Sequence, residues 1–419
     1  MIDINLIREN PELVKDIIKK NKNHKLHLVD DFLEADSNFR ELKQEADNLR
    51  KKRNDISSTI GELVRNGNKE EVENQKTKAN EIGSKILELE TEEKNWETKR
   101  SSIWKQIPNI IDESVPIGKD DSENVELEKF GEPVIPNYEI PYHTEIMEKL
   151  NGIDLDGARE VTGNGFYYLT GDIARLHSAV LTYARDFMID RGFTYVIPPF
   201  MMRGSAVEGV MSFEEMDDMM YKIEGEDLYL IGTSEHTMIA RYINRVINTL
   251  PLTLTSYSPC FRKEKGAHGI EERGIYRIHQ FEKQEMIVVC EPKDSMDWYN
   301  KMWNYTVEFF RSLDIPVRTL ECCSGDLADL KVKSVDVEAW SPRQQKYFEV
   351  GSCSNLGDAQ ARRLNIKMAD GKHPHTLNNT VVAPPRMLIA LLENNYNEDG
   401  SIRIPEVLKR YMGGKEVIK

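Results

Sequence analysis

The sequence is poor in cysteine and lacks long apolar segments, and both shortages exclude classes of protein. Its 419 residues hold five cysteines with no CxxC pair among them. This odd, scattered set favours reduced thiols over disulfides or a structural zinc module. No run of about 18 apolar residues occurs, so no membrane-spanning helix is expected. The opening segment MIDINLIREN is too polar for a secretory signal, and we therefore expect a cytoplasmic protein without a membrane partner.

The common phosphate-binding glycine motifs and an excess of basic charge are also missing. Neither GxGxxG nor GxxxxGK(S/T) occurs, so any nucleotide must be bound by other means. Lys and Arg total 56 against 71 Asp and Glu, a net charge of −15. A chain this acidic cannot coat a nucleic acid by bulk charge and would need a local basic patch. The 419 residues are enough for about two or three folded domains, and the apolar share of 39% is enough to form their cores.

Residues 36–110 carry an apolar repeat of 3.5 residues that predicts a helical hairpin. Seven of the eight positions spaced alternately by 3 and 4 from Phe39 are apolar, as are nine of the twelve from Val72. The Asn/Gly segment at 65–69 separates the two series, as expected of a turn between antiparallel helices. About 30 residues in the first helix give an arm about 45 Å long. An arm of that length cannot be buried within a globule, so we expect it to project.

The predicted arm is electrically neutral, whereas the rest of the chain carries the whole negative charge. Residues 36–110 contain 15 basic and 15 acidic residues. Four consecutive basic residues towards the tip, Arg50, Lys51, Lys52 and Arg53, are candidates for binding a polyanion. Two plainer interpretations stay open: a solvated helix face, or a hairpin that serves only dimerisation or spacing.

The remainder of the chain predicts an α+β domain. A segment rich in proline and glycine at 112–141 is interpreted as a linker. A helical pattern follows at 174–193, ended by the strand-like TYVIPPF. Later strand patterns mostly follow one another without helices between them, which favours an antiparallel sheet flanked by helices over a doubly wound parallel sheet. These strand patterns lie at 227–233, 252–261, 276–290 and 346–354. The domains predicted are 1–111, the linker 112–141, and 142–419.

Charged residues recur in a predicted hairpin at 261–285, where strand-like segments flank a polar loop that contains glycine. They are Arg262, Glu264, Arg277 and Glu285. Arginine binds phosphate or carboxylate through a rigid two-point fork, and glutamate can fix an amino group. Scattered surface ion pairs would explain the same residues if the hairpin were considered alone.

Two later segments add groups of matching chemistry. Glu349 and Ser352 near a strand end offer oxygen ligands suited to magnesium, although a buried carboxylate would also explain this pair. Arg386 follows Pro384 and Pro385 at the start of an amphipathic helix. A cation in the first turn opposes the helix dipole, so we expect an anion beside Arg386, unless the arginine is simply exposed.

Taken together and in this order, these features resemble the three signature motifs of class II aminoacyl-tRNA synthetases, and in detail the seryl-tRNA synthetase family. That family has a TSE or TAE triplet, an RxE followed by RxHQF, a strand like EVSSCSN, and HTLN before its last motif. The counterparts here lie at 233–235, 262–281, 349–355 and 375–378. The resemblance extends to the N-terminal hairpin and the linker. The TSEH sequence and the last motif without glycine resemble the archaeal members.

The resemblance implies a serine–tRNA ligase, which forms seryl-adenylate from serine and ATP and transfers the seryl group to tRNA(Ser). Arg262 and Arg386 are the catalytic residues implied, and Glu349 with Ser352 would hold Mg²⁺. The ATP-binding residues implied are Arg262, Lys263, Glu264, Arg277, Ile278, Phe281, Glu349, Val350, Gly351, Ser352 and Arg386. The serine-binding residues implied are Thr233, Ser234, Glu235, Arg262, Glu285 and Thr380. The family also implies a homodimer, and charging of tRNA(Sec) is left open.

This sequence departs from the family at two points, and three other functions stay open. Gly351 stands where the family often has serine, and two prolines precede Arg386 in place of a Gly- or Thr/Ser-rich approach. A synthetase-like ligase that loads carrier proteins resembles the catalytic half without the arm. A catalytically inactive RNA-binding paralogue is disfavoured, because an inactive site has no physical reason to keep the charged residues of the motifs. A zinc-dependent synthetase of the methanogen type is disfavoured by the arm and by the missing cysteine ligands.

Overall fold

The computed structural model describes residues 1–264 and 274–419 and divides the chain into two compact units. One comprises Ile2–Pro108, and the other comprises Met1 with Asn109–Lys419. The loop expected between the two strands of the hairpin at 261–285 lies outside the described residues. None of the helices in the described ranges combines the length and apolar character needed to cross a membrane.

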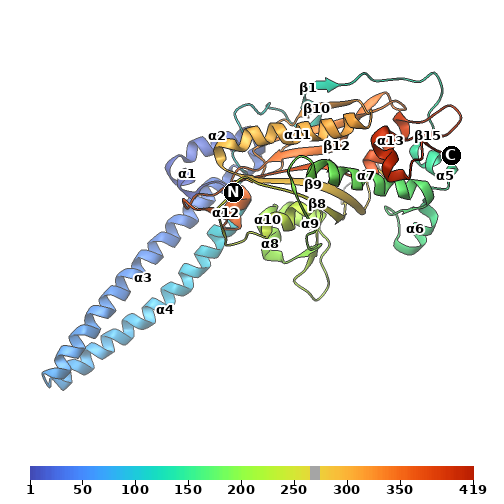
Figure 1. The fold of residues 1–419 in the computed structure, drawn as a ribbon. Coiled ribbons are helices and arrows are strands. Elements are labelled where there is room, and N and C mark those ends of the chain that lie inside the picture. Colours follow the sequence, from blue (N-terminus) through green and yellow to red (C-terminus); the bar gives the residue numbers. More distant parts are fainter. Residues whose placement is uncertain (265–273) are drawn as a thin grey trace. The chain divides into compact units, whose positions relative to one another are not determined.

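The helical unit confirms the predicted hairpin. Its helices are α1 (Ile4–Glu9), α2 (Pro11–Lys22), α3 (His27–Arg65) and α4 (Lys69–Gln106). The two long helices α3 and α4 lie side by side and antiparallel (Figure 1). Helix α3 begins at His27 rather than near residue 36, so its 39 residues span about 58 Å. The arm is therefore longer than the sequence pattern predicted.

The apolar repeat holds the hairpin together. Every apolar position of the repeat in α3 and α4 is buried or half-buried, whereas Arg53, the polar exception in the first helix, is exposed. The turn between the helices needs a left-handed residue, and Gly67 supplies it with φ +75°. The side chain of Asn68 then caps α4 by accepting from the backbone N–H of Glu71.

A buried ion cluster ties α1, α3 and α4 together. The carboxylate of Asp36 accepts from Nε and Nη2 of Arg8 at 2.7 Å each and from Nη1 of Arg100 at 3.2 Å. The side chain of Asp36 is only 4% exposed. Burial acts to raise the pKa of Asp36, but Arg8 and Arg100 outweigh it and hold that pKa below its ordinary value. The ionised carboxylate is therefore the form that the fold requires.

Changing Asp36 to Asn is expected to destabilise the helical unit by about 3 kcal/mol or more, because two arginines lose a buried partner. A depressed pKa contributes stability above the unfolded pKa of about 4, and this contribution is lost as pH falls through the folded value. The difference in unfolding free energy between wild type and Asp36→Asn should therefore be largest at neutral pH and should disappear in acid. Hydrogen exchange of α3 and α4 across pH measures it. The exposed Asp31 provides the control Asp31→Asn, and equal behaviour of the two variants would contradict the prediction.

The second unit is built on one eight-stranded sheet. Its order is β1 (Val125–Phe130), β10 (Val317–Glu321), β11 (Lys333–Ser341), β12 (Lys346–Asn355), β14 (His375–Val382), β9 (Gln280–Cys290), β8 (Leu252–Phe261) and β4 (Thr194–Val196). All neighbouring pairs are antiparallel except β4 with β8. The predicted antiparallel sheet is thus confirmed. The segment 112–141 is more than the expected linker, because β1 forms the edge of this sheet.

Helices cover both faces of the sheet, as alternate residues of β9 show. Met286 and Val288 belong to a core with α7 (Gly171–Ile189), α11 (Ser295–Ser312) and α13 (Pro384–Asn394). Ile287 and Val289 belong to a second core with α8 (Gly204–Val210), α10 (Ser234–Ala240) and α12 (Ala359–Arg363). Figure 1 shows α8 and α10 beside β8 and β9. Because successive side chains of a strand face opposite sides, one strand serves both cores.

Short elements complete the second unit. The helices are α5 (His143–Lys149), α6 (Leu155–Thr162), α9 (Phe213–Met219) and α14 (Glu406–Lys409). The strands are β2 (Ile153–Asp154), β3 (Tyr168–Leu169), β5 (Met201–Met202), β6 (Tyr229–Leu230), β7 (Val246–Ile247), β13 (Lys367–Met368), β15 (Ile402–Arg403) and β16 (Val417–Ile418). The strand pattern expected at 227–233 thus yields only the short strand β6.

Candidate active site

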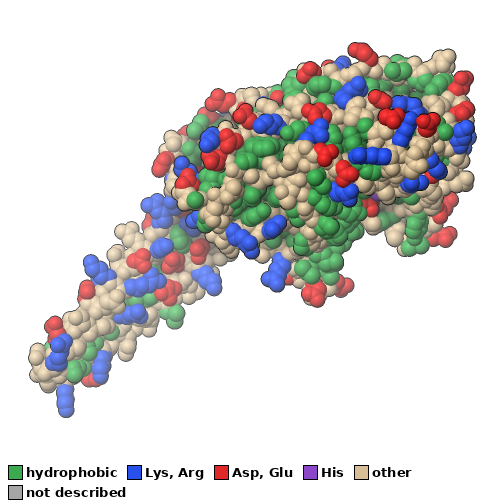
Figure 2. All heavy atoms as spheres, viewed as in Figure 1, with side chains coloured by type: hydrophobic (Ala, Val, Ile, Leu, Met, Phe, Trp, Pro, Cys, Tyr) green, Lys and Arg blue, Asp and Glu red, His purple; other side chains and the backbone are tan. Residues whose placement is uncertain are grey.

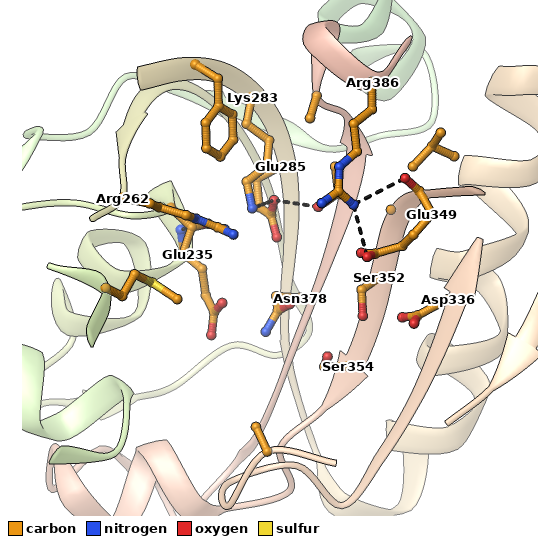
Figure 3. A pocket seen from close by; sticks show the side chains of 18 of the residues that line it. Glu235, Arg262, Lys283, Glu285, Asp336, Glu349, Ser352, Ser354, Asn378 and Arg386 are labelled. Atoms are coloured by element: carbon orange, nitrogen blue, oxygen red, sulfur yellow. Dashed lines mark hydrogen bonds and ion pairs between the residues drawn. The ribbon is translucent and has the colours of Figure 1, made fainter. Parts of the chain in front are cut away.

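A cavity of about 490 Å³ opens over the middle strands of the sheet and gathers most of the predicted site residues. Figure 3 shows charged side chains of β9, β12 and α13 turned towards this shared space. Alternation explains the part played by β9, since Phe281, Lys283 and Glu285 share one face of the strand. The predicted residues that line the cavity are Thr233, Glu235, Arg262, Glu264, Arg277, Ile278, Phe281, Glu285, Glu349, Val350, Gly351, Ser352, Thr380 and Arg386.

One end of the cavity is organised by Arg386. Helix α13 begins at Pro384, which places Arg386 in the first turn. Its Nη1 lies 2.9 Å from Oε2 of Glu349 and donates to the backbone oxygen of Glu349 at 3.2 Å. The anion expected beside this arginine is therefore Glu349. Burial acts to raise the pKa of Glu349, but Arg386 outweighs it and holds that pKa below its ordinary value.

Asp336 is a member of this end that the sequence did not single out. It lies on β11 opposite Ser352 of β12. Burial, followed by the charge of Glu349, raises the pKa of Asp336 to about 7. A weak signal exists in the sequence, since Asp336 alternates with the buried apolar Val335 and Val337. Asp336, Glu349 and Ser352 together present the hard oxygen donors that a divalent cation prefers.

The segments before and after the residues outside the described ranges supply two arginines of the cavity, Arg262 and Arg277. Arg262 directly follows β8, and its Nε donates to the backbone oxygen of Gly232 at 3.2 Å. Its guanidinium lies 5.2 Å from the centre of the Phe281 ring. Glu264 and Arg277, both among the predicted ATP-binding residues, form an ion pair with each other at 3.1 Å.

The other end of the cavity holds two buried carboxylates, Glu235 and Glu285. Nζ of Lys283 lies 2.6 Å from Oε2 of Glu285, and Oγ1 of Thr380 donates to the same oxygen at 3.4 Å. Burial, followed by the charge of Glu285, raises the pKa of Glu235 to about 7. Burial, followed by the charge of Lys283, lowers the pKa of His236 to about 3, so this imidazole stays neutral.

Lys283 and His236 were missed in the sequence, although His236 follows the predicted Glu235 and Lys283 lies two positions from the predicted Glu285. Lys283 is only 6% exposed and His236 5%. A lysine two positions before Glu285 on a strand faces the same side, which is the signal that would have found it.

Two predicted residues lie outside the lining of the cavity. Ser234 is fully buried, and its hydroxyl accepts from Ser256 at 2.6 Å. Nζ of Lys263 donates to the backbone oxygen of Asp217 at 3.3 Å. Side-chain contacts of these two residues with a ligand in the cavity are therefore not supported, because both side chains are directed elsewhere.

The four residues of the basic cluster on the arm differ in their surroundings. Arg50 pairs with Asp47 on its own helix and with Glu90 of α4, at 2.8 Å from the latter. Lys51, Lys52 and Arg53 are exposed. Figure 2 shows Lys and Arg side chains along much of the hairpin, interspersed with acidic ones. Arg50 therefore stabilises the hairpin, and the exposed members of the cluster are the better candidates for contact with a polyanion.

Comparison with known proteins identifies this arrangement. Residues 1–111 match the family model of the seryl-tRNA synthetase N-terminal domain, and residues 219–395 match the tRNA synthetase class II core domain (G, H, P, S and T). A serine–tRNA ligase of Methanocella arvoryzae is 42% identical over 427 residues, covering 100% of both chains. The chain belongs to the seryl-tRNA synthetase family. Its function is that of a serine–tRNA ligase, and it is therefore an aminoacyl-tRNA ligase.

Solved seryl-tRNA synthetases show the same fold over the full length. The enzyme from Pyrococcus horikoshii, determined with ATP, has a TM-score of 0.92 at 40% identity and covers 100% of this chain and 99% of its own. The cytoplasmic enzyme from Naegleria fowleri, determined with AMP, has a TM-score of 0.89 at 32% identity with the same coverage. Because the similarity of these synthetases includes the N-terminal unit, a carrier-protein ligase without an arm is set aside. The serine–tRNA ligases that match over the full chain set aside an inactive paralogue.

Proposed function

We propose that the cavity condenses serine with ATP to form seryl-adenylate and pyrophosphate, and then transfers the seryl group to the 3′ end of tRNA(Ser). The observation that carries this proposal is the meeting, in one cavity of about 490 Å³, of arginines suited to phosphates and carboxylates suited to an amino acid. Nucleotide binding is supported by the related synthetases solved with ATP and with AMP.

Positive charge in the cavity accounts for phosphate binding. Arg262 would contact both the carboxylate of serine and the α-phosphate, and so hold the reactants together for in-line attack. Arg277 and Arg386 would stabilise the outer phosphates and the leaving pyrophosphate. Glu264 would accept from the amino group of adenine while Phe281 stacks on the ring. Arg277 must then exchange its contact with Glu264 for one with phosphate.

The site for Mg²⁺ fits the residues that are present. Glu349 and Ser352 would hold the ion, with Asp336 as an additional oxygen donor across the strand pair. When bound, the ion would neutralise charge on the phosphate oxygens. Glu349 already carries negative charge, because Arg386 keeps its pKa low. Asp336 would become more fully ionised beside a cation, because its pKa near 7 reflects burial and repulsion from Glu349.

The two buried carboxylates account for recognition of serine. Glu285 and Thr380 would bind the side-chain hydroxyl, while Glu235 with Thr233 would receive the ammonium group. A buried acceptor for a hydroxyl rejects alanine by about 10⁴, because alanine leaves that acceptor unpaired. Threonine would be excluded by the size of the pocket.

The remaining assignments concern the whole molecule. Residues 1–111 would bind tRNA through the arm, 142–419 would perform catalysis, and 112–141 would connect them while supplying β1. The protein would act as a cytoplasmic homodimer. Exposed apolar side chains at the end of α7, Ile189 with 44% exposure, and directly after β4, Ile197 with 69% exposure, support a covered surface there.

Pyrophosphate exchange measured with each of the twenty amino acids tests the proposal. Serine should support exchange, with alanine lower by about 10⁴ in kcat/KM. In Glu285→Ala, kcat/KM for serine should fall by at least about 100-fold while the preference over alanine shrinks. Faster exchange with another amino acid would overturn the assignment. An unchanged preference for serine over alanine in Glu285→Ala would instead show that another residue recognises the hydroxyl group.

A further inference from the structure

Helix α12 places one fully buried glutamine behind the amino-acid end of the cavity. The side chain of Gln360 is 0% exposed and lies outside the cavity lining. Its Nε2 donates to Oε1 of Glu235 at 2.7 Å and to the backbone oxygen of Val210 at 3.1 Å. Its Oε1 accepts from the hydroxyl of Thr376 at 2.6 Å. The amide is thus held on three sides by groups from α8, α10 and β14.

The orientation of this amide is determined by its partners. A backbone carbonyl can only accept, so the NH₂ group of Gln360 must face Val210. The same group therefore also faces Glu235. An N–H donor favours an ionised carboxylate over the protonated acid. Gln360 thus stabilises the charged form of Glu235 as well as its direction.

Glu235 needs such support because its surroundings oppose ionisation. Burial and the neighbouring Glu285 of β9 raise its pKa to about 7, while Gln360, Lys283 and Lys331 act to lower it. Lys283 is already paired with Glu285 at 2.6 Å. The other titratable groups that face this end of the cavity are Arg262, after β8, and the neutral His236 of α10.

The same helix also fixes the wall of the cavity above Glu235. Nη1 of Arg363, one turn after Gln360, donates to the backbone oxygens of Met211 at 2.7 Å and Glu208 at 3.1 Å. Val210 and Met211 both line the cavity. Helix α12 is therefore hydrogen-bonded both to the end of α8 and to the carboxylate of Glu235.

We propose that Gln360 is a positioning residue for serine: it holds the carboxylate of Glu235 ionised and directed towards the ammonium group of the amino acid. This inference rests on the proposed role of Glu235. It adds a residue that touches neither substrate and acts on serine binding but not on ATP binding.

Gln360→Met tests this, because methionine has similar volume and no N–H donor. Pyrophosphate exchange is measured from about pH 6 to about pH 8.5, with KM for serine and for ATP determined separately. In wild type, KM for serine should fall as pH rises through about 7. In the variant this fall should occur at higher pH, with KM for serine at pH 7 raised about tenfold. KM for ATP should stay within about twofold, and the difference in KM for serine should narrow at the alkaline end.

Two further variants separate positioning from simple structural support. Gln284→Met removes another fully buried amide, which donates to Thr255 at 2.7 Å from the opposite face of β9. It should leave the pH profile for serine in place. Thr376→Val keeps Gln360 but removes the hydroxyl that donates to its Oε1. The fall in KM for serine should then move to higher pH, as in Gln360→Met, but by a smaller amount. If Gln360→Met fails to fold, Thr376→Val still tests the proposal.

Three outcomes would overturn the inference. An unchanged KM for serine in Gln360→Met would show that Glu235 needs no support. A rise in KM for serine and ATP together, without movement of the pH profile, would show a merely structural role. An unchanged KM for serine in Glu235→Gln would refute the proposed role of Glu235 itself. That last result is distinguishable because it does not depend on any change at Gln360.

Discussion

Arg262→Ala is expected to slow serine-dependent pyrophosphate exchange by about 10²–10³-fold or more. Arg262 lines the cavity, and it is held by the backbone oxygen of Gly232 and by the ring of Phe281. We assign it to both reactants, so its loss removes their alignment and the stabilisation of charge at the α-phosphate. The effect should appear mainly in kcat, because the interaction strengthens as the transition state forms.

Two comparisons make the Arg262 result interpretable. Arg262→Lys should recover only part of the rate, because a point charge cannot reproduce the two-point contact of a guanidinium. Arg403, which is 48% exposed and pairs with Asp314, provides the control Arg403→Ala, which should exchange at the wild-type rate. An Arg262→Ala enzyme with normal exchange would show that this arginine is structural and that the chemistry of the cavity is assigned wrongly.

Shortening the arm is expected to abolish charging of tRNA while pyrophosphate exchange continues. The chain allows a matched deletion of residues 43–56 from α3 and 79–92 from α4. Each segment is two heptads long, so the apolar seam keeps its register, and the turn with Gly67 is retained. The deletion removes the exposed basic residues Lys51, Lys52 and Arg53. Because the two helices form a unit separate from the sheet, adenylate formation should stay within about threefold of wild type.

Exchange and aminoacylation assays on the same preparation measure this separation. Replacing Lys51, Lys52 and Arg53 together by alanine should weaken charging and flatten its dependence on salt, if these residues neutralise phosphates. Arg50 should be left intact, since its pairing with Glu90 supports the hairpin. Normal charging by the shortened protein would refute the role of the arm. Loss of exchange as well would mean that the two units are not independent.

The helical hairpin was predictable because its information is local. A repeat of apolar residues at 3.5 positions determines which faces of α3 and α4 pack together, and an Asn/Gly turn determines where they reverse. The start of α3 at His27 was missed because the first turns of this helix pack against α1 and α2, outside the heptad pattern. Strands β8 and β12 were placed closely for a similar reason, since their alternation is visible in the sequence.

Part of the site was predictable only through resemblance. Arg262, Glu349 and Arg386 were identified by motif, and the structure brings all three into one cavity. Ser234 and Lys263 belong to the same motifs, yet their side chains contact Ser256 and Asp217 instead. A motif specifies which residues are present, but the direction of each side chain depends on neighbours that the motif does not contain.

The amino-acid sequence by itself determined the helical hairpin, the longest strands of the sheet, the division into a helical arm and an α+β unit, and the identity of most charged groups. Only the tertiary structure decided which of these groups are partners. Gln360 and Glu235 are 125 positions apart, and Asp336 meets Ser352 across two strands. Periodicity records the local preference of the backbone, whereas burial and charge at the site arise from contacts between distant segments, which exist only once the chain has folded.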